Sequence, residues 1–350
     1  MLNQQIVRGP LSEAENEAIL REYNRLTSSR IPMNEFVNWV QRSPAGPAWH
    51  ALLTTDEGRV VGHTSLFPFT TRSNPSLTPT KSEYSFMHED FRKQQIRGHE
   101  HAARPAFIVL LGNLFEHASR ERWGPIFAST NEKNRVFTRW VGLKPAEYQV
   151  WECLFVLRPI MASRHTPNIS SRQRAALAAA GVSHRLLWIA AQSIVGKMNG
   201  VKSVPVHGEL TEANGSRISF FEDAASLRWR YLDGQYVRFS LQHSPQSYLI
   251  AKRGSHDRYL RVCQWHLEKE TPLKPLVVAL LRHARADKAL GVRWALYDGD
   301  AASMSLLKQM QRMGFACAQR ARTVMIHKKD PEFLSPDAWN MNDSLFSFDP

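Results

Sequence analysis

Cysteine is scarce in this sequence: 350 residues contain three, and they stand far apart. An odd number of widely spaced cysteines does not build a disulfide framework. The absence of a CxxC pair or a cysteine–histidine cluster argues against a structural zinc motif. We therefore expect Cys153, Cys263 and Cys317 to be reduced thiols in a reducing cytoplasm, and we expect no metal site.

Long apolar runs are missing as well. The longest, such as Leu186–Val195, reach about half the length that a membrane-spanning helix requires. The opening stretch MLNQQIVRGPLSEAENEAIL lacks the basic-then-apolar pattern of a signal peptide. The sequence therefore predicts a soluble, cytoplasmic protein.

Acidic residues are absent between Cys153 and Gly208, although lysine and arginine are frequent there. Within this stretch, the sequence of residues 172–198 predicts a helical region in which Trp188 and aliphatic side chains stand beside lysine and arginine residues. A basic helix of this kind can lie on anionic lipid headgroups, so one interpretation is peripheral contact with the inner membrane. The other interpretation is a linker helix packed between two domains, with its lysine and arginine side chains in solvent.

The chain as a whole is strongly basic, with a net charge of +13 and a pI near 9.9. This balance favours anionic partners, which include nucleic acid, a membrane surface, an acidic glycan or a phosphorylated cofactor. The sequence carries no recognised motif for sequence-specific nucleic-acid binding.

Two halves of the chain repeat one order of elements: long helix, strand, short helix closed by a glycine, strand. In the first half the order runs from Pro105 through IFAST and a helix ending at Gly142 to QVWECLFVLRP. In the second half it runs from TPLKPLVVALL through VRWALYDGD and a helix ending at Gly314 to CAQRARTVMIHKK. The repeat indicates duplicated α/β units. We expect an N-terminal domain over 1–160, basic apolar linker helices over 161–200 and a C-terminal domain over 201–350.

Two phrases of the first half resemble motifs of the GNAT acyltransferase superfamily. MHEDFRKQQIRGHEHAARP, before the long buried helix, is similar to the family's acyl-CoA loop, and FASTNEKNRVFTRWVGL is similar to the segment that follows the family's fifth strand. The resemblance implies an α/β fold of two tandem GNAT-like units, each a mixed, mostly antiparallel, twisted sheet flanked by helices. It also implies acetyl-CoA or another acyl-CoA as the cofactor.

In the family, the pyrophosphate of acyl-CoA lies on backbone N–H groups at a helix N-terminus, where unpaired donors and the helix dipole favour an anion. By this resemblance the cofactor-binding residues are Phe86, Met87, Arg92, Lys93, Gln94, Gln95, Ile96, Arg97, Gly98, Asn131 and Asn134. Gln95 and Arg97 stand where the family has small residues, and Thr138 stands where it has a tyrosine acid. Either the loop is rebuilt, with basic side chains holding the phosphates, or acyl-CoA binding has weakened.

Acyl transfer from a thioester needs a neutral amine and donors for the oxyanion. In the first half, Glu83 and His88 flank the strand SEYSFM and are candidate bases, and Tyr84 is a candidate replacement for the missing acid. Backbone N–H groups from Phe86 to His88 would supply the oxyanion donors, as the resemblance implies. Candidate acceptor-binding residues are Arg228, Arg230 and His266.

The resulting functional prediction is an N-acyltransferase that moves an acyl group from acyl-CoA to an amine acceptor. LRWRYLDGQY and DAWNMNDSLF resemble phrases of tandem GNAT proteins associated with bacterial polysaccharide biosynthesis, which implies a small-molecule or glycan acceptor such as an amino-sugar. Two alternatives remain. One is a catalytically decayed GNAT-like binding or scaffold protein. The other is a Fem-type transferase dependent on aminoacyl-tRNA, although the helical-arm insertion of those enzymes is missing from the sequence.

Overall fold

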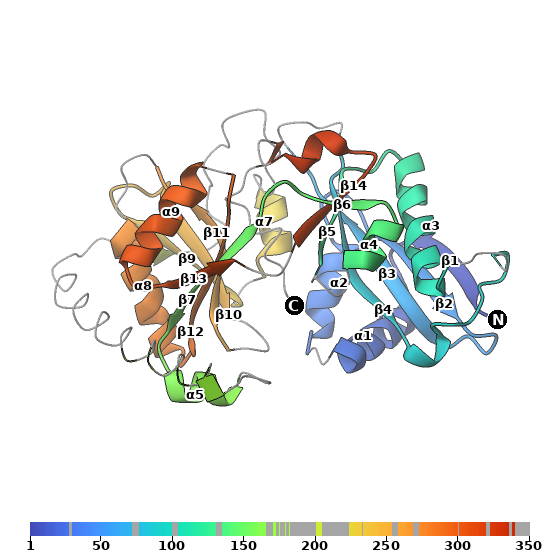
Figure 1. Ribbon diagram of the computed structural model, residues 1–350, viewed down its shortest axis with the longest axis horizontal. Coiled ribbons are helices and arrows are strands. Elements are labelled where there is room, and N and C mark those ends of the chain that lie inside the picture. Colours follow the sequence, from blue (N-terminus) through green and yellow to red (C-terminus); the bar gives the residue numbers. More distant parts are fainter. Residues whose placement is uncertain are drawn as a thin grey trace. The chain divides into compact units, whose positions relative to one another are not determined.

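The computed structural model describes residues 1–27, 30–71, 77–99, 104–130, 135–165, 201–204, 224–232, 234–253, 258–268, 273–299, 301–319, 323–335 and 338–339, together with residues 171, 172, 175, 179 and 182. These residues form two compact units, each built on its own mixed sheet (Figure 1). The N-unit comprises Met1–Glu147, Ala213–Arg230 and Ala321–Trp339, and the C-unit comprises Tyr148–Glu212, Tyr231–Arg320 and Asn340–Pro350.

The sheet of the N-unit has the strand order β1-β2-β3-β4-β5-β14-β6. Its neighbours pair antiparallel, except for the parallel pair β4–β5. The strands are β1 (Asn3–Arg8), β2 (Trp49–Thr54), β3 (Val60–Pro68), β4 (Thr80–Met87), β5 (Ile126–Thr130), β14 (Thr323–His327) and β6 (Leu143–Pro145).

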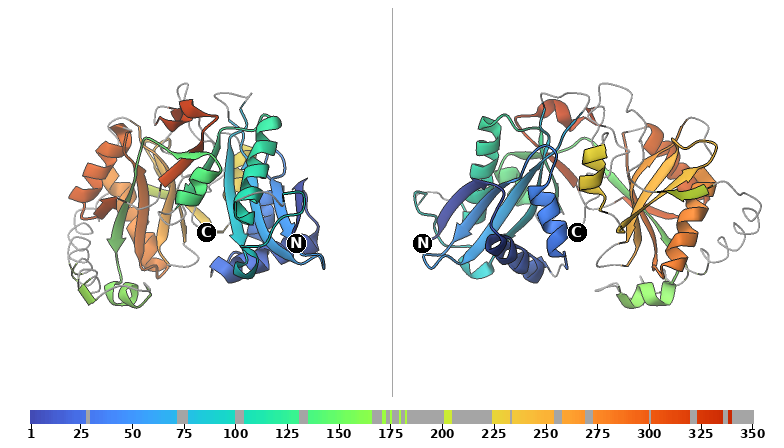
Figure 2. Two further views of the ribbon diagram at one scale, coloured as in Figure 1. Left: turned by 45° about the vertical axis from the view of Figure 1, so that its right-hand side comes forward. Right: turned by 180° about the vertical axis from the view of Figure 1, so that it is seen from behind.

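Helices cover both faces of this sheet (Figure 2). The helices are α1 (Glu13–Thr27), α2 (Met33–Gln41), α3 (Ala106–Arg120), α4 (Arg135–Trp140) and α7 (Ala224–Arg230), with single 3₁₀ turns at η1 (Glu89–Phe91) and η3 (Pro331–Leu334). α3 packs on the face that carries Ala51 and Leu53. α1 packs on the opposite face, where the ring of Tyr23 contacts that of Phe86.

Local sequence explains where these helices begin. Ser12 caps the N-terminus of α1: its hydroxyl accepts the N–H of Glu15 at 3.3 Å, and the Glu15 carboxylate accepts the N–H of Ser12 at 2.8 Å. These two hydrogen bonds form a reciprocal capping box, which the sequence motif S-x-x-E is typical of. α3 starts directly after Pro105, and its buried side chains alternate with half-buried ones around the helix.

The sheet of the C-unit has the strand order β13-β7-β12-β11-β10-β9-β8, with one parallel pair, β11–β12. The strands are β7 (Val150–Val156), β8 (Val201–Val204), β9 (Tyr236–Leu241), β10 (Tyr248–Arg253), β11 (Leu260–His266), β12 (Gly291–Tyr297) and β13 (Ala316–Gln319). Its helices are α5 (Pro159–His165), α8 (Leu273–Ala286) and α9 (Ala301–Arg312). The two sheets with flanking helices confirm the predicted α/β class and its tandem units.

Each unit contains a strand from the other half of the sequence. The predicted contiguous domains, 1–160 and 201–350, therefore do not coincide with the two units. β7, expected to close the first half, pairs with β12 and β13 in the C-unit. β14, expected at the end of the second half, pairs with β5 and β6 in the N-unit. Alternating apolar residues predict a strand but not its partner, so the exchange leaves no local signal.

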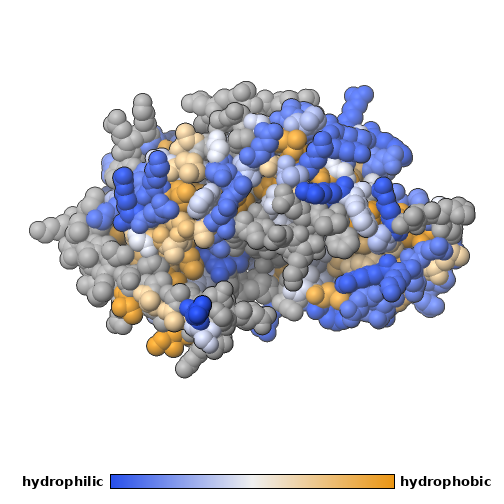
Figure 3. Space-filling view, in the orientation of Figure 1, coloured by the Kyte–Doolittle hydropathy of each residue, from blue (hydrophilic) through white to orange (hydrophobic). Residues whose placement is uncertain are grey.

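Within the described part of the chain, no helix is both long and apolar enough to cross a membrane. Most of segment 172–198, which carries the prediction of membrane contact, lies outside the described residues. α5 precedes this segment and exposes Ile160 and Met161, whose exposed fractions are 67% and 38%. Apolar surface is visible at the lower left of the space-filling view, where α5 lies (Figure 3).

Candidate active site

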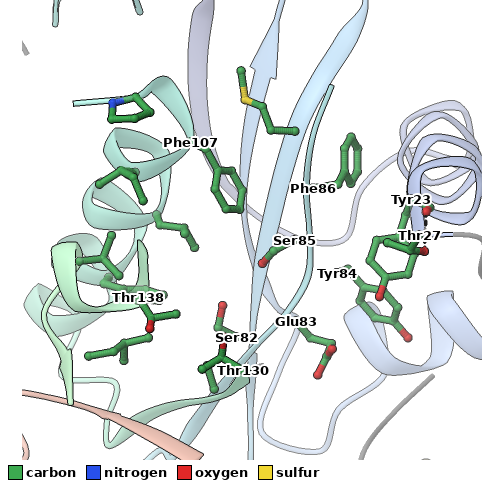
Figure 4. Close-up of a pocket in the computed structure, with 18 of the residues that line it drawn as sticks. Tyr23, Thr27, Ser82, Glu83, Tyr84, Ser85, Phe86, Phe107, Thr130 and Thr138 are labelled. Carbon is green, nitrogen blue, oxygen red and sulfur yellow. Dashed lines mark hydrogen bonds between the residues drawn. The ribbon is translucent and has the colours of Figure 1, made fainter. Parts of the chain in front are cut away.

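The parallel strands β4 and β5 pair only at their starts, at Thr80↔Ile126 and Lys81↔Phe127. Beyond these pairs the strands part, and a cavity of about 640 Å³ lies in the opening (Figure 4). Its lining comes from α1, β4, the loop after β4, α3, β5, α4 and β6. The lining residues are Tyr23, Leu26, Thr27, Ser82, Glu83, Tyr84, Ser85, Phe86, Met87, Arg92, Lys93, Pro105, Phe107, Ile108, Leu111, Phe115, Ala128, Ser129, Thr130, Thr138, Val141 and Leu143.

A β-bulge lies in the wall of this cavity. Between the pairs His63↔Phe86 and Ser65↔Glu83, β4 has one more residue than β3. Tyr84, within the bulge, has φ +50°, a left-handed conformation that costs a non-glycine residue about 1–2 kcal/mol. A bulge re-aims backbone groups and side chains, and here it does so beside a cavity.

Glu83, the first candidate base, lines the cavity and belongs to a close ion pair. Its Oε2 lies 2.5 Å from Nζ of Lys81, whose side chain is 3% exposed compared with 21% for Glu83. The buried ammonium orients the carboxylate. Figure 4 shows the Glu83 side chain in the opening beside Ser82 and Thr130.

Tyr84, the candidate acid, also lines the cavity, but its ring packs into an aromatic cluster. The ring centroids of Phe36 and Tyr23 lie 4.9 and 5.2 Å from that of Tyr84. Burial, followed by the charges of Glu35 and Glu83, raises the pKa of the Tyr84 phenol well above its usual value. A phenol with a raised pKa is a weaker acid, so the structure offers little support for proton donation by Tyr84.

His88, the other candidate base, is held in the turn that follows β4. Its backbone N–H donates to the carbonyl of Val61 at 2.8 Å, so the expectation that this group is an oxyanion donor is wrong. Its Nδ1 lies 3.3 Å from a carboxylate oxygen of Asp90. It is not among the residues that line the cavity. These contacts are those of a residue that shapes the loop.

The predicted cofactor loop divides into two parts. Phe86, Met87, Arg92 and Lys93 line the cavity, whereas Gln94, Gln95, Ile96, Arg97 and Gly98 do not.

The second part of the loop is tied elsewhere in the N-unit. Ile96 is 1% exposed in the α3 core and bridges to Leu2, while Arg97 pairs with Asp56 at 3.1 Å. Arg97 therefore faces the β2–β3 turn, and the positive charges in the cavity lining come from Arg92 and Lys93.

The remaining predicted site residues are spread over the chain. Asn131 and Asn134 lie outside the described residues. Thr138 of α4 lines the cavity. Arg228 and Arg230 belong to α7 of the N-unit, and neither lines the cavity. Arg230 is 1% exposed, so it lies in the interior rather than on the helix surface.

His266, the third candidate acceptor residue, belongs to β11 of the C-unit. Its ring stacks on that of Tyr248 at 6.1 Å. Burial lowers the pKa of His266, and the nearby Glu268 opposes this shift.

Sequence reasoning missed two sets of cavity residues. Tyr23 and Thr27 come from α1, and no local pattern indicates that a surface helix will cover a site formed by β4 and β5. Small polar residues inside the strands were a usable signal, because strands of a packed core seldom carry several of them. These are Ser82, Ser85, Ser129 and Thr130.

Comparison with known proteins gives the fold its context. No protein-family model matches the chain, and no curated protein sequence does. Among solved structures, it is similar to a conserved protein of unknown function and probable N-acyltransferase from Enterococcus faecalis V583. The TM-score is 0.54 at 9% identity, and the match covers 92% of this chain and 71% of that one.

Two further solved structures are similar to the chain. A tandem GNAT protein from the clavulanic acid biosynthesis pathway matches with a TM-score of 0.50 at 13% identity, over 92% of this chain and 97% of that one. Saccharomyces cerevisiae N-myristoyltransferase with bound myristoyl-CoA matches with a TM-score of 0.54 at 8% identity, over 93% of this chain and 82% of that one. The chain has a tandem GNAT-like fold.

The two GNAT-like units differ where their parallel strands part. In the N-unit this region carries small residues on β4 and β5 and contains the cavity. In the C-unit the parallel pairing of β11 and β12 ends at Val262↔Trp294, and the buried rings of Trp294 and Trp265 lie 6.3 Å apart within the core. Large indole side chains thus occupy strand positions of the C-unit comparable to those where the N-unit has serine and alanine.

Proposed function

We propose that the N-unit binds an acyl-CoA in the opening between β4 and β5 and transfers its acyl group to an amine. The observation that carries this proposal is the cavity itself. It joins a parted parallel strand pair, a β-bulge, the first turn of α3 and two basic side chains. The GNAT-like fold supports the same location, because the family places the cofactor's pyrophosphate at the start of its central helix.

The anionic part of the cofactor would lie near the first turn of α3. The early residues Pro105, Phe107 and Ile108 line the cavity, and the first turn contains no acidic side chain. The N–H groups of a first turn lack intrahelical partners and attract anions. Arg92 and Lys93 add positive charge on the same cavity.

The reaction requires the amine nitrogen to attack the thioester carbon. A C–N bond forms, the C–S bond breaks, and the CoA thiolate leaves. Glu83 is the residue we assign as the base, directly or through a water molecule, because it is the carboxylate of the cavity lining and Lys81 orients it. Since Tyr84 is a weak acid in its aromatic cluster and Thr138 is a poor donor, water protonates the thiolate.

The acceptor class that the cavity favours is a small amine bearing hydroxyl groups, such as an amino-sugar or a glycan precursor. Hydroxyl side chains recur along the lining, and a polyhydroxylated acceptor can exchange hydrogen bonds with them. They are Tyr23, Thr27, Ser82, Tyr84, Ser85, Ser129, Thr130 and Thr138. The chain of an alkylamine has no groups that could exchange hydrogen bonds with these hydroxyls.

The test is thiol release from acetyl-CoA with amino-sugars and with alkylamines as acceptors. We expect turnover with at least one amino-sugar, and a loss of about 10²-fold or more in Glu83→Gln, because a general base typically contributes a factor of about 10²–10⁴ to the rate. Glu116→Gln is the matched control, because Glu116 pairs with Arg120 on the exposed side of α3. Equal turnover in the Glu83→Gln variant and the wild type would reject Glu83 as the base.

A further inference from the structure

Side chains of β3 hold the bulge of β4 from one side. Oγ of Ser65 donates to the carbonyl of Glu83 at 3.0 Å, and Nδ1 of His63 lies 2.9 Å from the carbonyl oxygen of Tyr84. Oγ1 of Thr64 lies 2.7 Å from the hydroxyl of Ser85. These contacts occupy polar groups where the extra residue interrupts the backbone ladder.

A second histidine forms a hydrogen bond with the first. His50 Nδ1 lies 3.0 Å from His63 Nε2. Burial lowers the pKa of His63 to about 4, and burial together with His63 lowers the pKa of His50, so both imidazoles are neutral near pH 7.

The tautomers follow from the hydrogen-bond partners. A carbonyl only accepts, so Nδ1 of His63 carries the proton and donates to Tyr84. Nε2 of His63 then accepts the Nδ1 proton of His50. The two hydrogen bonds therefore run in one direction, from His50 to His63 and from His63 to the carbonyl of Tyr84.

The held carbonyls determine where the neighbouring N–H groups point. In a trans peptide the C=O and the following N–H point in opposite directions. With the carbonyl of Tyr84 held by His63, the N–H of Ser85 points away from His63, and the side chain of Ser85 lines the cavity (Figure 4). With the carbonyl of Glu83 held by Ser65, the N–H of Tyr84 likewise points away from Ser65.

We propose that His63 and Ser65 are positioning residues that hold the bulge so that the N–H groups of Tyr84 and Ser85 donate to the thioester oxygen in the cavity. This inference rests on the proposed acyl-CoA site. Tyr84 is in a left-handed conformation, which persists only where the surroundings hold it. His50 acts one step further out, by donating a hydrogen bond to Nε2 of His63.

The catalytic consequence concerns the oxyanion. As the amine attacks, negative charge develops on the thioester oxygen, and donors that are already oriented stabilise it without reorganising. Loss of one such donor typically lowers kcat by about 10²–10³-fold. Removal of a side chain that orients the donors should lower kcat more than it raises the Kd of acetyl-CoA.

The experiment uses the infrared carbonyl stretch of acetyl-CoA labelled with carbon-13 at the carbonyl and bound to the full chain. Hydrogen bonds to the carbonyl oxygen lower its stretching frequency. His63→Ala removes the donor to Tyr84. His63→Asn is the rescue variant, because the amide nitrogen of asparagine lies near the position of Nδ1. His117→Ala is the control, since His117 packs on Trp49 in the same unit at 4.3 Å and does not touch the bulge.

We expect the carbonyl stretching frequency of acetyl-CoA to fall when it binds to the wild type, His63→Asn or His117→Ala. With His63→Ala most of this shift should be lost, while the Kd of acetyl-CoA stays within about threefold of the wild-type value. Ser65→Ala, which deletes a single oxygen, should reduce the shift as well and replaces His63→Ala if that variant does not fold. A full shift in both His63→Ala and Ser65→Ala, or an equal loss in His117→Ala, would overturn the inference. The Kd of acetyl-CoA for the wild type is measured separately by titration. If the wild type does not bind acetyl-CoA, the proposed function fails together with this inference, whereas binding without a frequency shift contradicts the inference alone.

Discussion

Burial sets the protonation of three histidines in the N-unit. It lowers the pKa of His63 to about 4 and that of His50 well below its usual value. His327 of β14 also has a pKa of about 4, because burial is reinforced by the positive charges of Lys329 and Lys328. Each of these residues is held neutral in the folded chain at a pH where the unfolded chain would protonate it.

The free energy of unfolding should therefore fall as the pH drops from 6.5 towards 4. The imidazole pKa is near 6.5 when unperturbed and about 4 for folded His63, so between these values the unfolded state binds more protons. This part of the stability is fully present above pH 6.5 and is lost on acidification. Each such histidine contributes a slope of up to about 1.4 kcal/mol per pH unit.

Urea unfolding across this pH range measures the slope. His63→Asn removes one of the titrating groups, so its slope should be shallower than that of the wild type by up to about 1.4 kcal/mol per pH unit. Identical slopes for the two proteins would show that His63 is protonated equally in the folded and unfolded states.

Two glycines, one in a helix and one in a strand, should respond in opposite ways to substitution by alanine. A Cβ at Gly112, inside α3, would have no neighbour within 4 Å, whereas a Cβ at Gly291, at the start of β12, would lie 2.0 Å from the backbone oxygen of Phe155. Backbone cannot yield as a flexible side chain can. The close approach of β12 to β7 therefore depends on the missing side chain.

We expect Gly112→Ala to raise the free energy of unfolding by about 0.5–1 kcal/mol, because alanine has less backbone freedom to lose in a helix. Gly291→Ala should lower it by about 3 kcal/mol through overpacking. Thermal and urea unfolding of both variants measure these changes. A neutral Gly291→Ala would mean that β7 and β12 do not approach as closely as the structure has them.

The sequence predicted helices and strands better than it predicted the contacts between them. The capping box at Ser12, the buried helix after Pro105 and the strand SEYSFM could all be read from local patterns. The bulge at Tyr84 could not, because its cause is the contact with β3. The separation of Arg92 from Arg97 was also hidden, since it depends on Asp56 and on burial of the intervening Ile96.

For the molecule as a whole, the exchange of β7 and β14 links the two GNAT-like units. β14 pairs with β5 on one side and β6 on the other, so it lies inside the sheet that forms the cavity wall. All of the cavity lining nevertheless comes before residue 144. A fragment chosen from sequence boundaries would hold every lining residue and still lack a strand of the sheet.

We therefore expect the fragment 1–160 neither to unfold cooperatively nor to bind acetyl-CoA, because β5 and β6 would expose unpaired backbone groups where β14 belongs. Circular dichroism and limited proteolysis check the fold. A chain truncated after residue 339 keeps β14 and serves as the control. A stable fragment 1–160 that binds acetyl-CoA would contradict the exchange.

Every proposed catalytic role requires acyl-CoA to bind in the opening between β4 and β5, and calorimetric titration measures this binding. We predict micromolar binding of acetyl-CoA to the wild type, weakened by about tenfold or more in Arg92→Ala/Lys93→Ala, because both side chains line the cavity. Arg97→Ala, which removes an equivalent charge that pairs with Asp56, should bind like the wild type. Absence of binding to the wild type, or equal weakening in the Arg97→Ala variant, would contradict the assignment of this site.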